Sequence, residues 1–251
     1  MENAADTLRI RGINSTVLKF VAVIAMFIDH VSAALIARVI LYGGYSETLY
    51  GIYYAMRMIG RLAFPIYCFL IVEGFQKTRS RARYAMRLGI FSLISEIPFD
   101  LAFKAEVLEF HYQNVFFTLF LGLLALCCYD FISKQELPKV VKWLLDGLAL
   151  TALVAVAELI RCDYGGMGVL AITAMYLLRR YKAAAMAAGC LVLALLNGNE
   201  YPAFLALIPA VLYDGSKGVG WKYFFYFFYP VHLLLLWLIA FCMGIAWIAV
   251  I

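Results

Sequence analysis

The fold is decided by the first long apolar stretch, residues 17–42, which reads VLKFVAVIAMFIDHVSAALIARVILY. A helix needs about 20 apolar residues to cross the roughly 30 Å hydrocarbon core of a bilayer, and this stretch exceeds that length. It has no small-residue cleavage site after a short apolar core, which a removable signal peptide would carry. The stretch therefore predicts an uncleaved helix that anchors the chain in a membrane.

Further apolar stretches follow along the whole chain. They cover residues 52–75, 84–104, 114–132, 141–160, 166–179, 183–197, 201–213 and 223–250. Those between residues 166 and 213 are short for a simple span, so they predict thin spans or re-entrant segments. The pattern predicts an all-α transmembrane bundle of about nine spans, formed by a single domain over residues 1–251.

The composition supports this class. Hydrophobic residues make up 65% of the chain and charged residues only 15%, and the mean hydropathy is +0.88. A soluble domain has roughly 45–50% apolar and about 25% charged residues. A chain with so little polar surface is stable in a bilayer, where the exterior contacts hydrocarbon.

The basic residues alternate between successive loops. They are Arg9, Arg11 and Lys19 near the start, then Lys77, Arg79, Arg81, Arg83 and Arg87, then Lys134, Lys139 and Lys142, then Arg179, Arg180 and Lys182, and finally Lys217 and Lys222. The intervening loops, 43–51, 105–113, 161–165 and 198–200, carry few. By the positive-inside rule this alternation predicts a cytoplasmic N-terminus and, with nine spans, an external C-terminus. It also accounts for the net charge of +5 without nucleic-acid binding.

The cysteines and histidines do not form a metal-binding or disulfide pattern. Of six cysteines, most lie inside apolar stretches and none forms a C-x-x-C pair. They are expected to be small buried apolar residues. No histidine has a ligand-type partner four residues away, and no H-E-x-x-H motif occurs. We therefore expect no metal.

Ionisable and amide side chains inside the apolar stretches are the candidate functional residues. Burying a charge at the centre of a membrane helix costs about 2.5–3.5 kcal/mol on insertion scales, so such residues commonly mark function. The alternative is a structural ion-pair network, since opposite charges at similar depth lower each other's cost. Both interpretations remain open for Arg57, Glu96, Asp100 and Glu158. The whole set comprises Asp29, His30, Arg57, Arg61, Glu96, Asp100, Asn114, Glu158, Asp163 and His232.

Two of the three histidines, His30 and His232, lie inside predicted spans, whereas His111 lies in a predicted outer loop. A neutral imidazole can accept or donate a proton near neutral pH, so both buried histidines are candidates for acid–base chemistry. Asp29 is adjacent to His30 and therefore points to a different helix face. A partner from another helix is better placed to orient His30.

An ordered set of short motifs extends through nearly the whole chain. It comprises Leu18-Lys19-Phe20, Met26-Phe27-Ile28-Asp29-His30, Gly60-Arg61-Leu62-Ala63-Phe64-Pro65, Glu73-Gly74-Phe75, Tyr84 with Arg87-Leu88, Ser95-Glu96-Ile97-Pro98-Phe99-Asp100, Asn114 with Thr118-Leu119, Asp163-Tyr164-Gly165 and Tyr229-Pro230-Val231-His232-Leu233. This set resembles the TraX family of membrane proteins, whose named member is associated with N-acetylation of a pilin. The chain is also distantly similar to the acyltransferase-3 group, in which a basic residue precedes a histidine by the spacing seen between Lys19 and His30.

The resemblance implies a membrane-bound acetyltransferase of the bacterial cytoplasmic membrane that uses acetyl-CoA. His30 would be the general base, and Arg61 and Asn114 would lie near the reacting carbonyl. Asp29, Arg57, Glu96, Asp100, Glu158, Asp163 and His232 would support the site. Lys19, Lys77, Arg79, Arg81 and Arg83 would bind the phosphates of coenzyme A, although positive-inside topology requires basic loops in any case.

Two other functions stay open. The same buried charges suit an ion- or proton-coupled transporter of a small charged solute, and an envelope assembly protein without catalysis would need them only for packing. Turnover of acetyl-CoA separates the enzyme from both. The expected partners are membrane lipid, acyl-CoA and an unidentified acceptor, which is a protein amine, a glycan, a lipid headgroup or a small molecule.

Overall fold

The computed structural model describes residues 12–250, apart from the side chain of Leu196. Arg9 and Arg11, which enter the orientation prediction, lie outside the described residues. Helices and connecting loops make up the described part of the chain, which has no strand and only isolated backbone bridges between Ile13 and Tyr213 and between Gln113 and Cys162. The all-α prediction is confirmed.

The helices follow the apolar stretches closely. They are α1 (Ser15–Val31), the π-helical turn η1 (Ser32–Ile36), α2 (Ala37–Gly43), α3 (Glu47–Gly60), α4 (Ala63–Lys77), α5 (Arg81–Phe103), α6 (Val115–Ser133), α7 (Lys139–Leu159), α8 (Gly165–Leu177), α9 (Lys182–Leu196), the 3₁₀ segment η2 (Gly198–Ala206), α10 (Leu207–Leu212) and α11 (Lys222–Cys242). Several begin at a side-chain cap: Asn14, Ser46, Ser80 and Asn114 accept hydrogen bonds from the first turns of α1, α3, α5 and α6.

Within residues 12–250, five helical segments are long and apolar enough to cross a membrane. They are Ser15–Gly43, Glu47–Lys77, Val115–Ser133, Lys139–Leu159 and Lys222–Cys242. Helices α8 and α9 are apolar but shorter, and α5 carries more charge. The stretch expected at 201–213 forms η2 followed by only six residues of α10. The number of nine spans and the N-terminal orientation therefore stay predictions.

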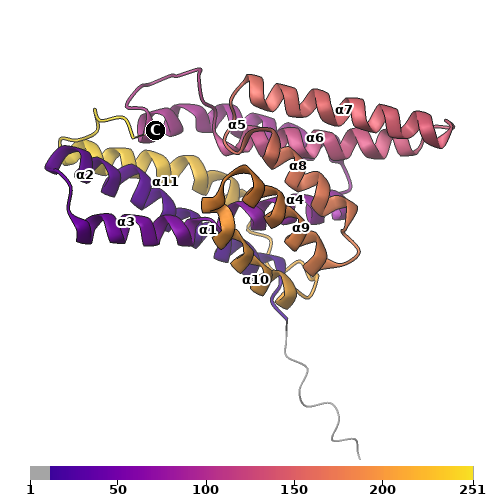
Figure 1. The fold of residues 1–251 in the computed structure, drawn as a ribbon, viewed down its shortest axis with the longest axis horizontal. Coiled ribbons are helices and arrows are strands. Elements are labelled where there is room, and N and C mark those ends of the chain that lie inside the picture. The colour runs from indigo at the N-terminus through magenta and orange to yellow at the C-terminus, as the bar shows by residue number, and fades with distance from the viewer. Residues whose placement is uncertain (1–11, 251) are drawn as a thin grey trace, which may run out of the picture.

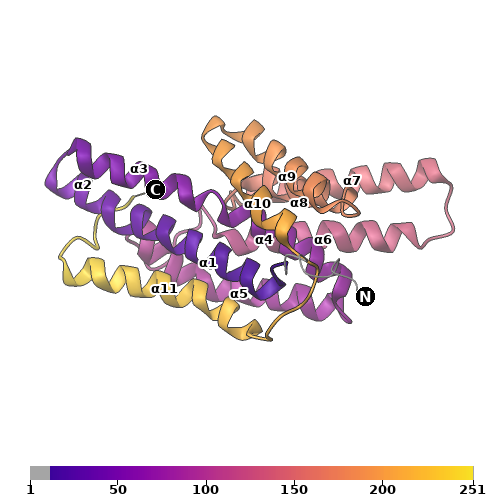
Figure 2. The same ribbon diagram turned by 90° about the horizontal axis from the view of Figure 1, so that it is seen from below.

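The bundle packs around α4, which contacts α1, α6, α8, α9 and η2. Helix α11 lies against α1 and α5, on the side of the bundle away from α7 (Figures 1 and 2). Helix α1 turns Leu18, Ala22, Ala25 and Met26 into the core, a spacing that places them on one helical face. Helix α7 is the opposite case, with only 6% of its apolar window buried. Its apolar exterior fits contact with lipid rather than water.

The π-helical turn begins two residues after His30 and leads to a buried arginine that the sequence did not mark as functional. Arg38 is fully buried. It donates to the backbone oxygens of Ala34 at 2.7 Å, Ala102 at 2.6 Å and Ile248 at 2.8 Å. The end of a helix presents carbonyls without helical partners, and Arg38 satisfies those at the end of α5. It thereby ties α2, α5 and the C-terminal tail together.

Candidate functional site

His30 of α1 and His232 of α11 form a direct hydrogen-bonded pair. Nδ1 of His30 lies 2.7 Å from Nε2 of His232, and the two rings are nearly parallel. Nδ1 of His232 lies 2.7 Å from the carbonyl oxygen of Phe228. The two helices that carry these residues contact each other, which brings together residues 202 positions apart in the chain.

The partners of His232 determine where the protons lie. A carbonyl oxygen only accepts, so Nδ1 of His232 carries its hydrogen and Nε2 is the acceptor in the neutral ring. Nδ1 of His30 therefore donates to His232. This assignment leaves the lone pair of His30 on Nε2, the form that a general base requires. The orienting partner is thus a histidine from another helix.

Aromatic side chains surround the histidine pair. The ring centroids of Phe103 and Tyr229 lie 5.4 Å and 5.8 Å from that of His30. Phe27 and Phe228 lie against His232 at 6.0 Å and 4.8 Å. An apolar collar of this kind excludes water and strengthens each electrostatic interaction inside it.

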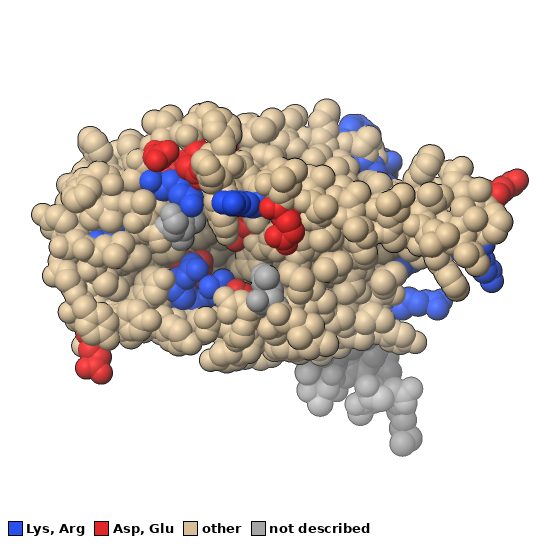
Figure 3. All heavy atoms as spheres, turned by 45° about the horizontal axis from the view of Figure 1, so that its top comes forward, with Lys and Arg blue, Asp and Glu red and all other residues tan. Residues whose placement is uncertain are grey.

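Two ion pairs form the charged cluster on the expected outer side of the histidines. Arg57 of α3 donates to Asp29 at 2.6 Å, and Arg61 contacts Glu200 of η2 at 2.8 Å. Gly60 makes room for the first pair, because a Cβ there would lie only 2.1 Å from Oδ1 of Asp29. Figure 3 shows side chains of both charges gathered around a hollow, in the half of the molecule where Figure 1 places α2 and α3.

Asp163 lies in the loop between α7 and α8 and completes this side of the bundle. It accepts a hydrogen bond from the Tyr112 hydroxyl at 2.9 Å, and its backbone carbonyl accepts from Thr118. Burial raises the pKa of the Asp163 carboxyl above its ordinary value. The next residue, Tyr164, stacks on Phe64 with a centroid separation of 3.6 Å.

The remaining predicted polar residues have local structural partners. Asn114 caps α6 through its side-chain oxygen, and its amide donates to Glu96 and to the Ser92 carbonyl. Asp100 accepts from the backbone of Glu109 at 2.8 Å. Glu158 accepts from the backbone N–H of Gly166 at 2.7 Å, at the start of α8. These contacts fix helix ends and loops, and they leave the amide hydrogens of Asn114 occupied.

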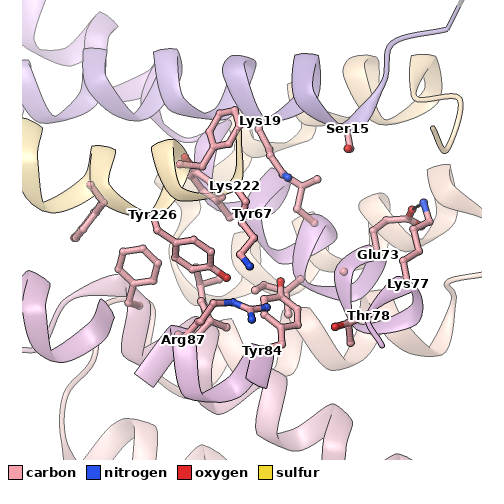
Figure 4. A pocket seen from close by; sticks show the side chains of 18 of the residues that line it. Ser15, Lys19, Tyr67, Glu73, Lys77, Thr78, Tyr84, Arg87, Lys222 and Tyr226 are labelled. Carbon is pink, nitrogen blue, oxygen red and sulfur yellow. Dashed lines mark hydrogen bonds and ion pairs between the residues drawn. The ribbon is translucent and has the colours of Figure 1, made fainter. Parts of the chain in front are cut away.

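A cavity of about 350 Å³ opens at the other end of the bundle, among the basic loops. Figure 4 shows Lys19 of α1, Arg87 of α5 and Lys222 of α11 directed into one space, with Tyr67, Tyr84 and Tyr226 around it. Lys217 also lines the cavity, because Ser15 and Thr16 hold its loop through hydrogen bonds to the carbonyls of residues 217 and 219. The deep wall contains Met26 and Tyr229.

The residues predicted to bind coenzyme A divide into two groups. Lys19 and Lys77 line the cavity, whereas Arg79, Arg81 and Arg83 do not. Arg81 instead pairs with Asp130 and stacks on Phe75. Neither Arg38 nor Glu200 stands out in the sequence, and Glu200 follows a short polar turn that is typical of an external loop. Among the described residues no cluster of histidine, cysteine or carboxylate side chains suits a metal ion.

These features define a class: a helical membrane protein with a hydrogen-bonded histidine pair, paired charges on one side of it and a basic cavity on the other. The chain belongs to the TraX family, since the TraX protein family matches residues 14–240. It is 32% identical over 246 residues to the "Probable fimbrial assembly protein FimC, serogroup H1" of Dichelobacter nodosus, covering 87% of this chain and 92% of that protein. No solved structure matches it. The family resemblance is confirmed.

Proposed function

We propose that this protein is a bacterial cytoplasmic-membrane acetyltransferase that moves an acetyl group from acetyl-CoA to an amine or hydroxyl. The observation that carries the proposal is the His30–His232 pair, in which the Phe228 carbonyl and His232 orient His30 with its lone pair on Nε2. A base held in one tautomer inside an apolar collar is suited to acyl transfer. Membership of the TraX family supports the same reaction.

In the proposed step, Nε2 of His30 takes the proton of the acceptor as the acceptor nitrogen or oxygen attacks the thioester carbonyl. The tetrahedral intermediate collapses with cleavage of the carbon–sulfur bond. The departing coenzyme A thiolate takes the proton back from the His30 imidazolium, so His30 returns to its starting form. Arg61, whose Nε lacks a hydrogen-bond partner among the described residues, supplies positive charge for the developing oxyanion.

The acceptor is proposed to approach from the side of the charged cluster. That side faces outward if the N-terminus is cytoplasmic, as the loop charges predict. The name of the fimbrial relative supports an acceptor in a surface appendage, such as the amine of a fimbrial subunit.

The test is coenzyme A release by the purified protein in detergent, with acetyl-CoA as donor. We expect His30→Ala to lose roughly 10²–10⁴-fold in rate, the usual contribution of a general base. His232→Ala, which removes the orienting partner, should lose less. His111→Ala is the matched control, because His111 is exposed in the 104–114 loop, and it should keep the wild-type rate.

Release that is equally fast in wild type and His30→Ala would overturn the proposal. A folded protein that neither binds acetyl-CoA nor releases coenzyme A would favour the transporter. Folding of each variant is checked by its thermal midpoint.

A further inference from the structure

The cavity at the basic end of the bundle is lined by several positive charges that no carboxylate among the described residues neutralises. Lys77 is neutralised by Glu73 and also contacts Tyr213. Lys19, Arg87, Lys217 and Lys222 form no ion pair with another described residue, although all of them line the cavity. Lys19 and Lys217 are close enough to repel each other, and the buried Nε of Arg87 has no hydrogen-bond partner among the described residues.

Lys217 and Lys222 are exposed, whereas Lys19 and Arg87 are partly buried, so the arrangement is costly for the protein alone mainly at Lys19 and Arg87. Like charges repel more strongly where the surroundings are partly apolar, and a desolvated donor without an acceptor is unfavourable. These cations come from α1, α5, α11 and the loop before α11, so no single helix end accounts for their convergence. An anion with several oxygens, such as a phosphate or pyrophosphate, would satisfy them together.

The shape of the cavity adds a second requirement. Its wall runs from the basic residues to Met26 and Tyr229 and includes Phe116 and Leu119. Met26 precedes His30 by four residues, and Tyr229 precedes His232 by three, so each lies about one helical turn from the histidine pair. A ligand that fills the cavity therefore has a polyanionic end among the cations and a slender, less polar arm directed at the histidines.

We propose that this cavity binds the acyl donor as a nucleotide thioester, with its phosphates held by Lys19, Arg87, Lys217 and Lys222 and its thioester arm extending past Met26 and Tyr229 toward His30. The tyrosines at residues 84 and 226 offer ring faces for the base. This assignment rests on the proposed acetyltransferase function and deepens it. It also moves donor binding from the exposed arginines Arg79 and Arg83 to the cavity.

An anionic lipid headgroup carries the same phosphate chemistry, and the experiment must separate the two ligands. The probe is coenzyme A itself, titrated calorimetrically into the purified full-length protein in lipid-free detergent. We expect coenzyme A to bind at least tenfold more tightly than pantetheine, which has the arm without the phosphates. The double variant Arg87→Gln/Lys222→Gln should bind coenzyme A at least tenfold more weakly than wild type.

The matched control is Arg79→Gln/Arg83→Gln, which removes the same charge from exposed side chains at this end of the bundle that do not line the cavity. Its affinity for coenzyme A should stay within twofold of wild type. An equal loss of coenzyme A affinity in the two double variants would overturn the proposal. It would show that binding depends on the total positive charge at this end of the bundle and not on the residues that line the cavity. Thermal midpoints show that both double variants are folded.

A second titration adds phosphatidylglycerol to the detergent. The proposal expects coenzyme A to retain its affinity within threefold. Loss of coenzyme A binding on lipid addition, with lipid binding that depends on Arg87 and Lys222, would identify a lipid site and overturn it.

The two proposals fail differently. If coenzyme A release depends on His30 but Arg87→Gln/Lys222→Gln binds coenzyme A normally, the cavity is not the donor site and the acetyltransferase stands. If the cavity binds coenzyme A as described but no acetyl-CoA is consumed with any acceptor, the donor site stands and the acetyltransferase falls.

Discussion

The two ends of this bundle differ in how their charged side chains are paired. At the end with α2, α3 and η2, Arg57 and Arg61 each contact a carboxylate, and Arg38 is enclosed by backbone carbonyls. At the other end, the cavity is lined by four cations that form no ion pair with any residue of 12–250: Lys19, Arg87, Lys217 and Lys222. Pairing lowers the cost of burying the charges at the first end, including that of Arg61, which is also proposed to stabilise the oxyanion. Unpaired charges that converge from several elements indicate a ligand. The predictions below test this division, because the first end should govern stability and the second should govern binding.

The largest expected effect is on Arg38. Arg38→Met keeps most of the side-chain volume but leaves the carbonyls of Ala102 and Ile248 without donors. An unsatisfied buried polar group costs about 1–3 kcal/mol, so we expect destabilisation of roughly 4 kcal/mol, or no folded protein. The measurement is the thermal midpoint in detergent. A midpoint within a few degrees of wild type would show that Arg38 does not hold the C-terminal tail.

The second largest loss of stability is expected on substitution of Arg61. Arg61→Ala leaves the Glu200 carboxylate buried and unpaired, which costs about 3 kcal/mol in comparable buried pairs. The double variant Arg61→Ala/Glu200→Ala removes both charges and should recover part of that loss, and a double-mutant cycle measures the coupling. Simple additivity of the two single variants would mean that the pair is not a structural unit.

A substitution at Gly60 tests the Asp29–Arg57 ion pair without changing either charged residue. In Gly60→Ala the new Cβ would meet the Asp29 carboxyl, so Asp29 must move away from Arg57. We expect destabilisation of about 1–3 kcal/mol, typical of overpacking, together with slower coenzyme A release because Asp29 adjoins His30. Gly51→Ala is the control, since a Cβ there meets nothing. An equal effect in both variants would assign the loss to helix geometry.

The smallest expected change in stability belongs to the basic cavity. Lys19→Gln removes a cation that has no described ion-pair partner, so the unfolding free energy should change by less than about 0.5 kcal/mol. Its affinity for coenzyme A should nevertheless fall, and the loss should shrink at high salt because screening weakens the contribution of Lys19 in wild type. A large drop in thermal midpoint would place Lys19 among the structural charges and remove the contrast between the two ends.

Sequence alone predicted much of this arrangement. Apolar length located the ends of most long helices to within about five residues, because crossing a bilayer fixes helix length. It extended the last stretch to residue 250, whereas α11 ends at Cys242. The scarcity of histidine directed attention to His30 and His232, and the structure pairs them. Neither hydropathy nor spacing reveals that α1 and α11 are neighbours, so the orienting role of His232 and the resulting tautomer required the structure.

Other residues were missed for identifiable reasons. Glu200 follows a turn of Asn and Gly residues that resembles a solvated loop, yet η2 folds back against α3 and α4. Arg38 is a charged residue within an apolar stretch, but its partners are backbone carbonyls, and the pattern of side chains in a sequence does not predict such contacts. Arg87, Lys217 and Lys222 had a sufficient explanation in the positive-inside rule, and only their convergence on one cavity distinguishes them from Arg79 and Arg83.

The central claim is that donor enters from the basic end and reacts at His30. Membrane vesicles of defined sidedness test it most directly, with acetyl-CoA added outside and coenzyme A release measured. The account predicts release from inverted vesicles, where the basic end faces the added acetyl-CoA, and none from right-side-out vesicles. It further predicts that His30→Ala abolishes this release and that His111→Ala preserves it. Release from right-side-out vesicles, or release from inverted vesicles that is unaffected by His30→Ala, would contradict it.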